Sequence, residues 1–377
     1  MKAVLELPNR LAVPFLDLKQ QYRNFGPELL QQIHEVLDSA YYIQGPKVAE
    51  FEQAFAEYCD VKHAIAVDSG SAALQLTLLG LDIGPGDEVV VPTNTFIATG
   101  AAVHVTGARP AFVDADPDSW QMDPDKVALA ISDRCRALIG VHLYGQPLAV
   151  ADLRDVCEAK GIPLIEDAAQ AHGARFEGGR VGSFGRAGCF SFYPGKNLGA
   201  FGDGGMIVTD DAKLADRIRR LRDHGRLTKY EHTEVGFNYR MDAIQGVVLR
   251  YKLRFLDDWN DGRRIWATRY AERLAELPLR LPKAIPGTEP VHHLFPVCCA
   301  SRDALATFLS ERGVETGVHY PIPLHLQPAF ERLGYKKGDF PVAEKIAQEI
   351  LSLPIFPEMT EQQFEYVCHS ISDFFGN

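Results

Sequence analysis

Between about residues 60 and 210, short apolar runs alternate with stretches of helical periodicity, and this alternation constrains the fold more than any other feature. It is typical of a sheet covered by helices on both faces, in which each strand is buried on both sides. We therefore predict an α/β fold with a mostly parallel seven-stranded sheet between helices. The expected strands lie at 64–67, 88–91, 111–113, 137–141, 164–165, 189–192 and 206–208.

The pattern changes after Met241, where a helical stretch over 242–277 is followed by Pro-rich connections, a strand at 293–299 and two further helices. A separate helical pattern at 27–40 precedes the sheet region. We predict an N-terminal segment (1–30), a large α/β domain (31–250) and a smaller α+β C-terminal domain (251–377). This division places the domain boundary inside one long helix.

Composition excludes several classes of protein. The net charge of -11 gives no broad positive field of the kind that binding to a nucleic-acid backbone requires, so we expect no nucleic-acid partner. Residues 1–30 lack a signal pattern, and no apolar stretch approaches the roughly 20 residues that span a bilayer, so we predict a cytoplasmic protein with no membrane partner. Its seven cysteines are odd in number and form no C-x-x-C pair, which indicates neither a metal site nor a disulfide framework.

The segment Asp68-Ser69-Gly70-Ser71 stands where an expected strand passes into a helix. The free N–H groups and positive dipole end of a helix start bind phosphate, so Gly70 and Ser71 are candidate phosphate ligands. The alternative is that Ser71 only caps the helix, because serine is a favoured capping residue.

Glu166 and Asp167 follow the strand expected at 164–165, on the edge where open α/β sheets bind their ligands. A carboxylate about 4 Å from a pyridinium nitrogen stabilises the cation by about 4 kcal/mol at an effective dielectric of 20. Asp167 is therefore a candidate partner for a protonated pyridine ring. The alternative is a helix cap at a strand-to-helix turn, and we expect Glu166 to turn away into a salt bridge.

Lys196 lies in a Gly-rich stretch, Tyr193-Pro194-Gly195-Lys196, that continues to Gly205 after a buried-looking strand. A lone lysine in such a turn is usually solvated. A lysine that is desolvated there has a lowered pKa and attacks carbonyl carbons.

A phosphate-binding helix start, a strand-end aspartate and a lysine 29 residues later resemble the fold-type-I pyridoxal 5′-phosphate (PLP) enzymes. The wording of these motifs is similar to that of the DegT/DnrJ/EryC1/StrS family of nucleotide-sugar aminotransferases. The resemblance covers nearly the whole chain, from the Val13–Leu18 segment to the His319–Gln327 segment.

This resemblance implies that Lys196 and Asp167 are catalytic: Lys196 holds PLP covalently, and Asp167 pairs with the pyridinium nitrogen. The other implied cofactor contacts are Gln170 at the ring O3′, Phe96 stacked on the ring, Gly70, Ser71 and Ser191 at the phosphate, and Asn238 at the phosphate of the other subunit's site. The implied substrate contacts are Tyr193, His319, Tyr320 and His325. Without the resemblance, Phe96 reads as a core residue, Asn238 as a turn residue, and the segment around Tyr320 as a surface turn.

The resemblance also implies a homodimer in which L-glutamate leaves its amino group on the cofactor as pyridoxamine phosphate, which then aminates the keto carbon of a nucleotide-linked sugar. Relatives that aminate carbon 4 carry His-Pro-x-Lys and Thr-Gly-Glu-Gly around the lysine. This chain has Tyr-Pro-Gly-Lys-Asn-Leu-Gly-Ala-Phe-Gly-Asp-Gly-Gly, which resembles the set that makes dTDP-3-amino-3,6-dideoxyhexoses from dTDP-3-keto-6-deoxyhexoses.

Three alternatives stay open at this point. A PLP-dependent sugar dehydratase has histidine where this chain has Lys196, which disfavours it. A glutamine-dependent aminotransferase that acts on a cyclitol ketone fits the same wording. A non-catalytic nucleotide-sugar-binding protein of the same fold predicts the loss of Asp167, Lys196 or the phosphate-binding helix start, and all are present.

Overall fold

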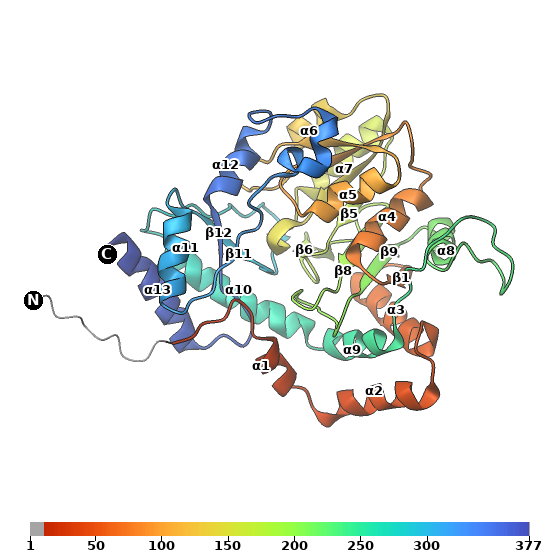
Figure 1. Cartoon of the computed structure of the whole chain (residues 1–377), viewed down its shortest axis with the longest axis horizontal. Coiled ribbons are helices and arrows are strands. Elements are labelled where there is room, and N and C mark those ends of the chain that lie inside the picture. Colours follow the sequence, from red (N-terminus) through yellow and green to blue (C-terminus); the bar gives the residue numbers. More distant parts are fainter. Residues whose placement is uncertain (1–10, 377) are drawn as a thin grey trace, which may run out of the picture.

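The computed structural model describes residues 11–376, and its centre is a seven-stranded sheet (Figure 1). The strand order is β1-β9-β8-β5-β4-β2-β3, and within this sheet β9 alone runs antiparallel to its neighbours. Each predicted strand is present, which confirms the predicted α/β class. The strands are β1 (His63–Val67), β2 (Glu88–Pro92), β3 (Arg109–Val113), β4 (Cys135–Val141), β5 (Leu164–Asp167), β8 (Ala187–Ser191) and β9 (Gly205–Thr209).

Helices cover both faces of the sheet, because strands with apolar side chains on both faces need a partner on each side. One face packs against α4, α5 and α8, and the other packs against α3, α9, α6 and α7. The helices are α1 (Leu18–Arg23), α2 (Pro27–Ser39), α3 (Gly45–Cys59), α4 (Gly70–Gly80), α5 (Ile97–Val105), α6 (Pro124–Ala130), α7 (Val150–Lys160), α8 (Ala212–Leu221) and α9 (Ala243–Leu253).

A second hydrophobic core lies among the elements that follow α9. Its centre is an antiparallel pair of strands, and the helix predicted over 27–40 is present as α2. The later elements are α10 (Leu256–Arg273), β10 (Thr288–Glu289), β11 (Phe295–Cys298), α11 (Arg302–Glu311), η2 (Leu324–Leu326), η3 (Pro328–Leu333), α12 (Pro341–Glu349), β12 (Ile350–Leu353) and α13 (Glu361–Phe375). Three short elements, η1 (Leu143–Gly145), β6 (Arg175–Phe176) and β7 (Gly179–Arg180), complete the larger part.

The division into three segments stays a prediction, and residues 1–10 of the proposed N-terminal segment lie outside the described residues. Among residues 11–376, no helix combines the length and the apolar character that crossing a bilayer requires.

The single long helix predicted over 242–277 is wrong. The chain forms α9 and α10 instead, with a two-residue turn at Arg254 and Phe255 between them, although both residues keep right-handed backbone angles. The Phe255 ring packs against the rings of Tyr251 and Trp259, with centroids at 5.6 and 5.9 Å. Neither proline nor glycine marks this break, so the sequence pattern runs through it unchanged.

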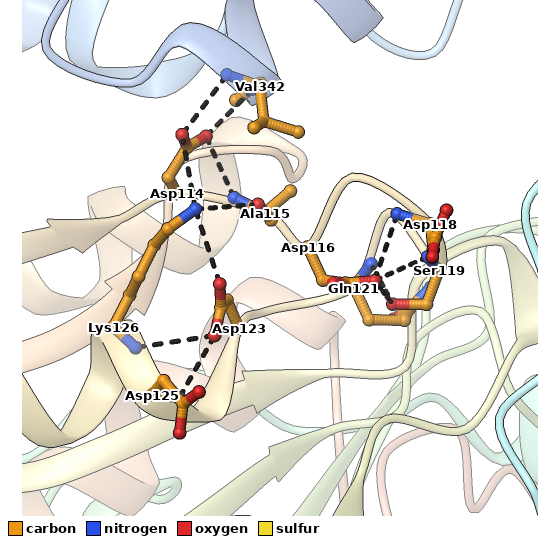
Figure 2. Close-up of polar contacts among 11 residues, drawn as sticks. Asp114, Ala115, Asp116, Asp118, Ser119, Gln121, Asp123, Asp125, Lys126 and Val342 are labelled. Atoms are coloured by element: carbon orange, nitrogen blue, oxygen red, sulfur yellow. Dashed lines mark hydrogen bonds and ion pairs between the residues drawn. The ribbon is translucent and has the colours of Figure 1, made fainter.

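A buried carboxylate ties the large sheet to α12 (Figure 2). Asp114 follows β3, and its oxygens accept hydrogen bonds from the backbone N–H groups of Ala343 (2.8 Å) and Val342 (3.2 Å). These donors belong to the first turn of α12, where backbone N–H groups have no partner within the helix. Asp114 therefore joins two parts of the chain that are distant in sequence.

Candidate active site

The residues predicted to bind the cofactor gather at one edge of the sheet. β1, β2, β5 and β8 are parallel, so their carboxyl ends meet at this edge, and each is followed by a predicted site residue. Gly70 follows β1, Phe96 follows β2, Asp167 ends β5, Ser191 ends β8, and Lys196 comes shortly after β8.

The start of α4 forms a small concave surface together with the end of β8. A Cβ atom on Gly70 would lie 2.7 Å from Cβ of Ser191, so only glycine fits and the two backbones approach closely. Ser69, rather than Ser71, caps the helix, because its Oγ accepts a hydrogen bond from the N–H of Ala72 at 3.1 Å. Ser71 is exposed in the first turn of α4, so its hydroxyl is accessible to a ligand.

Asp167 is a buried carboxylate at the centre of the edge, only 5% exposed. One oxygen accepts a hydrogen bond from Thr99 Oγ1 at 2.9 Å, and the other accepts one from the N–H of Ala169 at 3.2 Å. Burial raises the pKa of Asp167, and the Thr99 hydrogen bond opposes that shift. No helix begins directly after β5, so the alternative of a helix cap is wrong. A buried carboxylate of this kind fits a cationic partner.

Glu166 turns away from the site, as predicted. One of its oxygens lies 2.9 Å from Nε2 of His142, and the carboxylate accepts hydrogen bonds from the backbone N–H groups of Gly182, Phe184 and Gly185. With these partners its charge is satisfied without a ligand, unlike that of its neighbour.

Lys196 is half-buried, and its surroundings differ from those of a solvated surface lysine. Burial lowers the pKa of Lys196 to about 8, and the negative charge of Asp167 opposes the shift. A lysine in this state is in part a neutral amine at physiological pH, which is the nucleophilic form.

A hydrogen bond and a ring contact connect Gln170, through Tyr320, to the exposed ring of Phe96. Gln170 accepts a hydrogen bond from the N–H of Tyr144 (2.6 Å) through Oε1, and its Nε2 donates to the hydroxyl of Tyr320 (3.0 Å). The ring of Tyr320 lies 5.5 Å from that of Phe96. Phe96 is 52% exposed, so the alternative of a core residue is wrong, and its ring is open to a flat ligand.

Two of the predicted substrate contacts lie beside these groups. Tyr193 follows Ser191, donates its N–H to the Ser191 hydroxyl at 3.4 Å, and is 61% exposed. Nδ1 of His319 lies 2.9 Å from Oγ of Ser352, and burial lowers the pKa of His319 to about 4. We therefore expect His319 to be neutral at physiological pH.

His325 does not lie where the prediction places it. Its side chain is buried, with Nε2 3.1 Å from the carboxylate of Glu344 and Nδ1 2.8 Å from the hydroxyl of Thr93. Because both ring nitrogens have partners within the protein, His325 has no free polar atom for a sugar, and we remove it from the proposed substrate contacts.

Asn238 is exposed on the loop after α8, where it forms a backbone bridge with Asp223. Its predicted role belongs to the site of a second subunit and stays a prediction.

The chain matches the model of the DegT/DnrJ/EryC1/StrS aminotransferase family over residues 24–372. It belongs to this family. It is 47% identical over 363 residues, 96% of both chains, to the dTDP-3-amino-3,4,6-trideoxy-α-D-glucose transaminase of Streptomyces venezuelae. It is also 45% identical over 357 residues, 95% of this chain and 96% of the relative, to the UDP-N-acetyl-3-dehydro-α-D-glucosamine 3-aminotransferase of Acidithiobacillus ferrooxidans. The crystal structure of DesV from S. venezuelae in complex with a ketimine intermediate has a TM-score of 0.95 and 47% identity, covering 97% of this chain and 99% of that one.

In this DegT/DnrJ/EryC1/StrS family member, the sequence did not reveal several groups around Lys196. Thr99 holds Asp167 from a helix that is 68 positions away in sequence. His172 and His293 lie close enough for Lys196 to affect their charge, and burial lowers the pKa of His172 to about 3. Thr99 lies three positions after Phe96, and this helical spacing indicates that the two side chains lie on the same face. No comparable spacing relates His172 or His293 to a predicted site residue.

Proposed function

We propose that the protein is a PLP-dependent aminotransferase that moves an amino group from L-glutamate to carbon 3 of a dTDP-3-keto-6-deoxyhexose. Its product would be a dTDP-3-amino-3,6-dideoxyhexose. One observation carries this proposal: the buried carboxylate of Asp167 and the partly desolvated amine of Lys196 lie near each other, at the edge where α4 begins.

The residues at this edge fit PLP in three respects. Asp167 is a buried carboxylate whose pKa is raised by burial, and a pyridinium nitrogen beside it would oppose that shift with its positive charge. Gly70, Ser71 and Ser191 offer backbone N–H groups and hydroxyls at a helix start, which suit a phosphate. Phe96 offers an exposed ring face for stacking.

When bound, PLP supplies an electrophilic carbon and a ring that accepts electrons. Asp167 would hold the ring nitrogen in its protonated form, because a buried carboxylate, fixed here by Thr99 and the N–H of Ala169, favours a positive charge beside it. Lys196 holds and moves a proton at Nζ, and its pKa of about 8 lies near the working pH, where general acid–base catalysis is most effective. Gln170 and Tyr320, which are joined by a hydrogen bond, would help to orient the cofactor ring.

The sugar position follows from the relatives. The names of both reported relatives place the amino group at carbon 3 of the sugar, which supports amination at carbon 3. They differ in the nucleotide, and we choose dTDP because the relative at 47% identity acts on a dTDP-sugar. Tyr193, His319 and Tyr320 are the proposed sugar contacts.

A homodimer with shared sites is part of the proposal. Large apolar side chains are exposed on two loops, at residues 41–43 and 227–235, and Figure 1 shows the second loop extending outward after α8. Exposed apolar groups of this size are typical of a protein interface. All seven cysteines are free and buried, which fits the reducing cytoplasm that we predict as the location.

The deciding experiment combines absorbance with substrate choice. Purified protein with PLP should show visible absorbance that L-glutamate removes and a dTDP-3-keto-6-deoxyhexose restores. Borohydride should fix PLP on Lys196, and Lys196→Ala should fold but show neither effect. Restoration by a 4-keto sugar alone, or by a cyclitol ketone after treatment with glutamine, would contradict the proposed substrate. Absence of any PLP absorbance would favour a non-catalytic sugar-binding protein.

A further inference from the structure

The loop after Lys196 is held by polar side chains from the α9–α10 junction. Asn197 Nδ2 donates to Oδ1 of Asn260 on α10 at 2.9 Å. The carbonyl of Gly199 accepts from Nζ of Lys252 in the last turn of α9. These two contacts involve alternate residues of the loop.

A third contact continues the alternation. The N–H of Phe201 donates to Oε1 of Gln245 on α9 at 2.8 Å. Gln245, Lys252 and Asn260, which we call the α9–α10 clamp, therefore hold the three alternate loop residues that follow Lys196. Figure 1 shows α9 and α10 following one another.

Burial shows that the Lys252 contact is not an incidental surface interaction. Lys252 is 1% exposed, and its ammonium lies between the rings of Phe25, Phe201 and Trp259, at 5.6 to 5.9 Å from their centroids. Burial lowers the pKa of Lys252 to about 8, while Glu358 opposes the shift. A buried ammonium is costly unless it is well partnered, and the Gly199 carbonyl and the ring faces are its partners here.

The orientation of the Asn197 and Asn260 side-chain amides is fixed by the backbone carbonyls to which they donate. Asn260 Nδ2 donates to the carbonyl of His172 at 2.9 Å, and Asn197 Nδ2 also donates to the carbonyl of Val291 at 3.0 Å. Backbone carbonyls only accept, so both amides have one possible orientation. In that orientation Asn197 Oδ1 accepts from Nδ1 of His293 at 3.2 Å, and every polar atom of the pair is satisfied.

The loop also makes close contacts with its own first residues, in addition to its contacts with the clamp. A Cβ atom on Gly199 would lie 2.2 Å from the carbonyl oxygen of Pro194, so the loop is folded tightly against its own start. The N–H of Lys196 donates to the carbonyl of Tyr193, and that of Ala200 donates to the carbonyl of Phe192. The loop is thus held by backbone hydrogen bonds within itself and by side-chain hydrogen bonds from the clamp.

We propose that the α9–α10 clamp is a positioning device for the Lys196 amine, set by its three hydrogen bonds to the loop that follows Lys196. The inference rests on the proposed role of Lys196. The clamp residues act by holding the backbone of the loop that follows Lys196.

The test measures loop motion in cofactor-free protein, so it does not depend on activity. We expect Lys252→Met and Asn260→Leu to speed hydrogen exchange at the amides of Lys196 and Ala200 by about tenfold or more, because the loop opens without its external partners. The matched control is Tyr270→Phe, which removes a buried hydroxyl on α10 that donates to Pro354 and not to the loop. Its exchange in the loop should equal that of the wild type.

A second readout uses protein loaded with PLP. The clamp variants should shift the pH midpoint of the bound-PLP absorbance and slow the reaction with glutamate by roughly 10- to 100-fold, because small displacements of a reacting group carry that cost. If the clamp variants show the same loop exchange rates and the same pH midpoint as Tyr270→Phe, the clamp serves only for packing and the inference is overturned. If Lys252→Met does not fold, Gln245→Ala and Asn260→Leu provide the same comparison.

Failure of the proposed function has a separate signature. If borohydride fixes PLP on a lysine other than Lys196 in the wild type, the function fails, and the inference about a catalytic amine fails with it. If PLP is fixed on Lys196 while the clamp variants exchange like the control, the inference alone is wrong.

Discussion

At the scale of single residues, Thr99 is the group that supports the charge of Asp167. Its hydroxyl donates to Asp167 at 2.9 Å in a buried environment. Thr99→Val keeps the shape and removes this bond, which raises the pKa of Asp167 further and weakens its hold on a cationic partner. We expect transamination to slow by roughly tenfold to a hundredfold, since a hydrogen bond to a charged group contributes about 1.5–3 kcal/mol. Single-turnover rates with glutamate measure the effect.

Thr106→Val is the control for that change. Thr106 is also buried, at the end of α5, but its hydroxyl donates to the carbonyl of Val103. Equal rate losses in both variants would show that Thr99 acts through stability and not through Asp167.

Lys196 gives the protein a characteristic dependence of stability on pH. Its folded pKa of about 8 lies below the ordinary 10.5, so the folded state of cofactor-free protein disfavours the charged amine. The penalty is complete below pH 8 and disappears as pH rises toward 10.5, where the unfolded state also loses the proton. Lys196→Met should raise the free energy of unfolding by about 2–3 kcal/mol at pH 7 and by progressively less between pH 8 and 10.5. Urea unfolding at several pH values measures this, with the exposed Lys337→Met as the control.

At the scale of elements, Asp114 stabilises the junction between β3 and α12 (Figure 2). Asp114→Ala leaves the buried N–H of Ala343 and the part-buried N–H of Val342, at the start of α12, without this partner. We expect the free energy of unfolding to fall by about 1–3 kcal/mol in urea titrations. Asp125→Ala, in the exposed first turn of α6, should change it by less than about 0.5 kcal/mol. An equal loss in both variants would rule out the capping role of Asp114.

At the scale of the whole molecule, the proposed dimer predicts that inactive subunits rescue each other. Lys196→Ala and Asn238→Ala should each be inactive or nearly so when alone. When the two are unfolded, mixed in equal amounts and refolded, half the dimers are mixed and each has one intact site. Activity should then recover to about a quarter of the wild-type value. No recovery, or a monomer by light scattering, would place Asn238 outside the partner's site.

The sequence by itself determined the sheet and most of the site. All seven strands follow from local apolar runs, and Gly70, Phe96, Asp167 and Lys196 each come shortly after a strand. Because parallel strands share one carboxyl edge, residues at these local positions necessarily meet. Local periodicity was therefore enough to bring them together.

Only the tertiary structure decided the remaining features. The burial of His325 between Thr93 and Glu344 and the Thr99–Asp167 bond depend on side chains that meet across the fold. A helical pattern predicts which face of a helix is apolar. It does not predict which residues, distant in sequence, will contact a polar side chain on that helix. The partners of His325 and Thr99 are fixed by packing, and packing is a property of the whole chain.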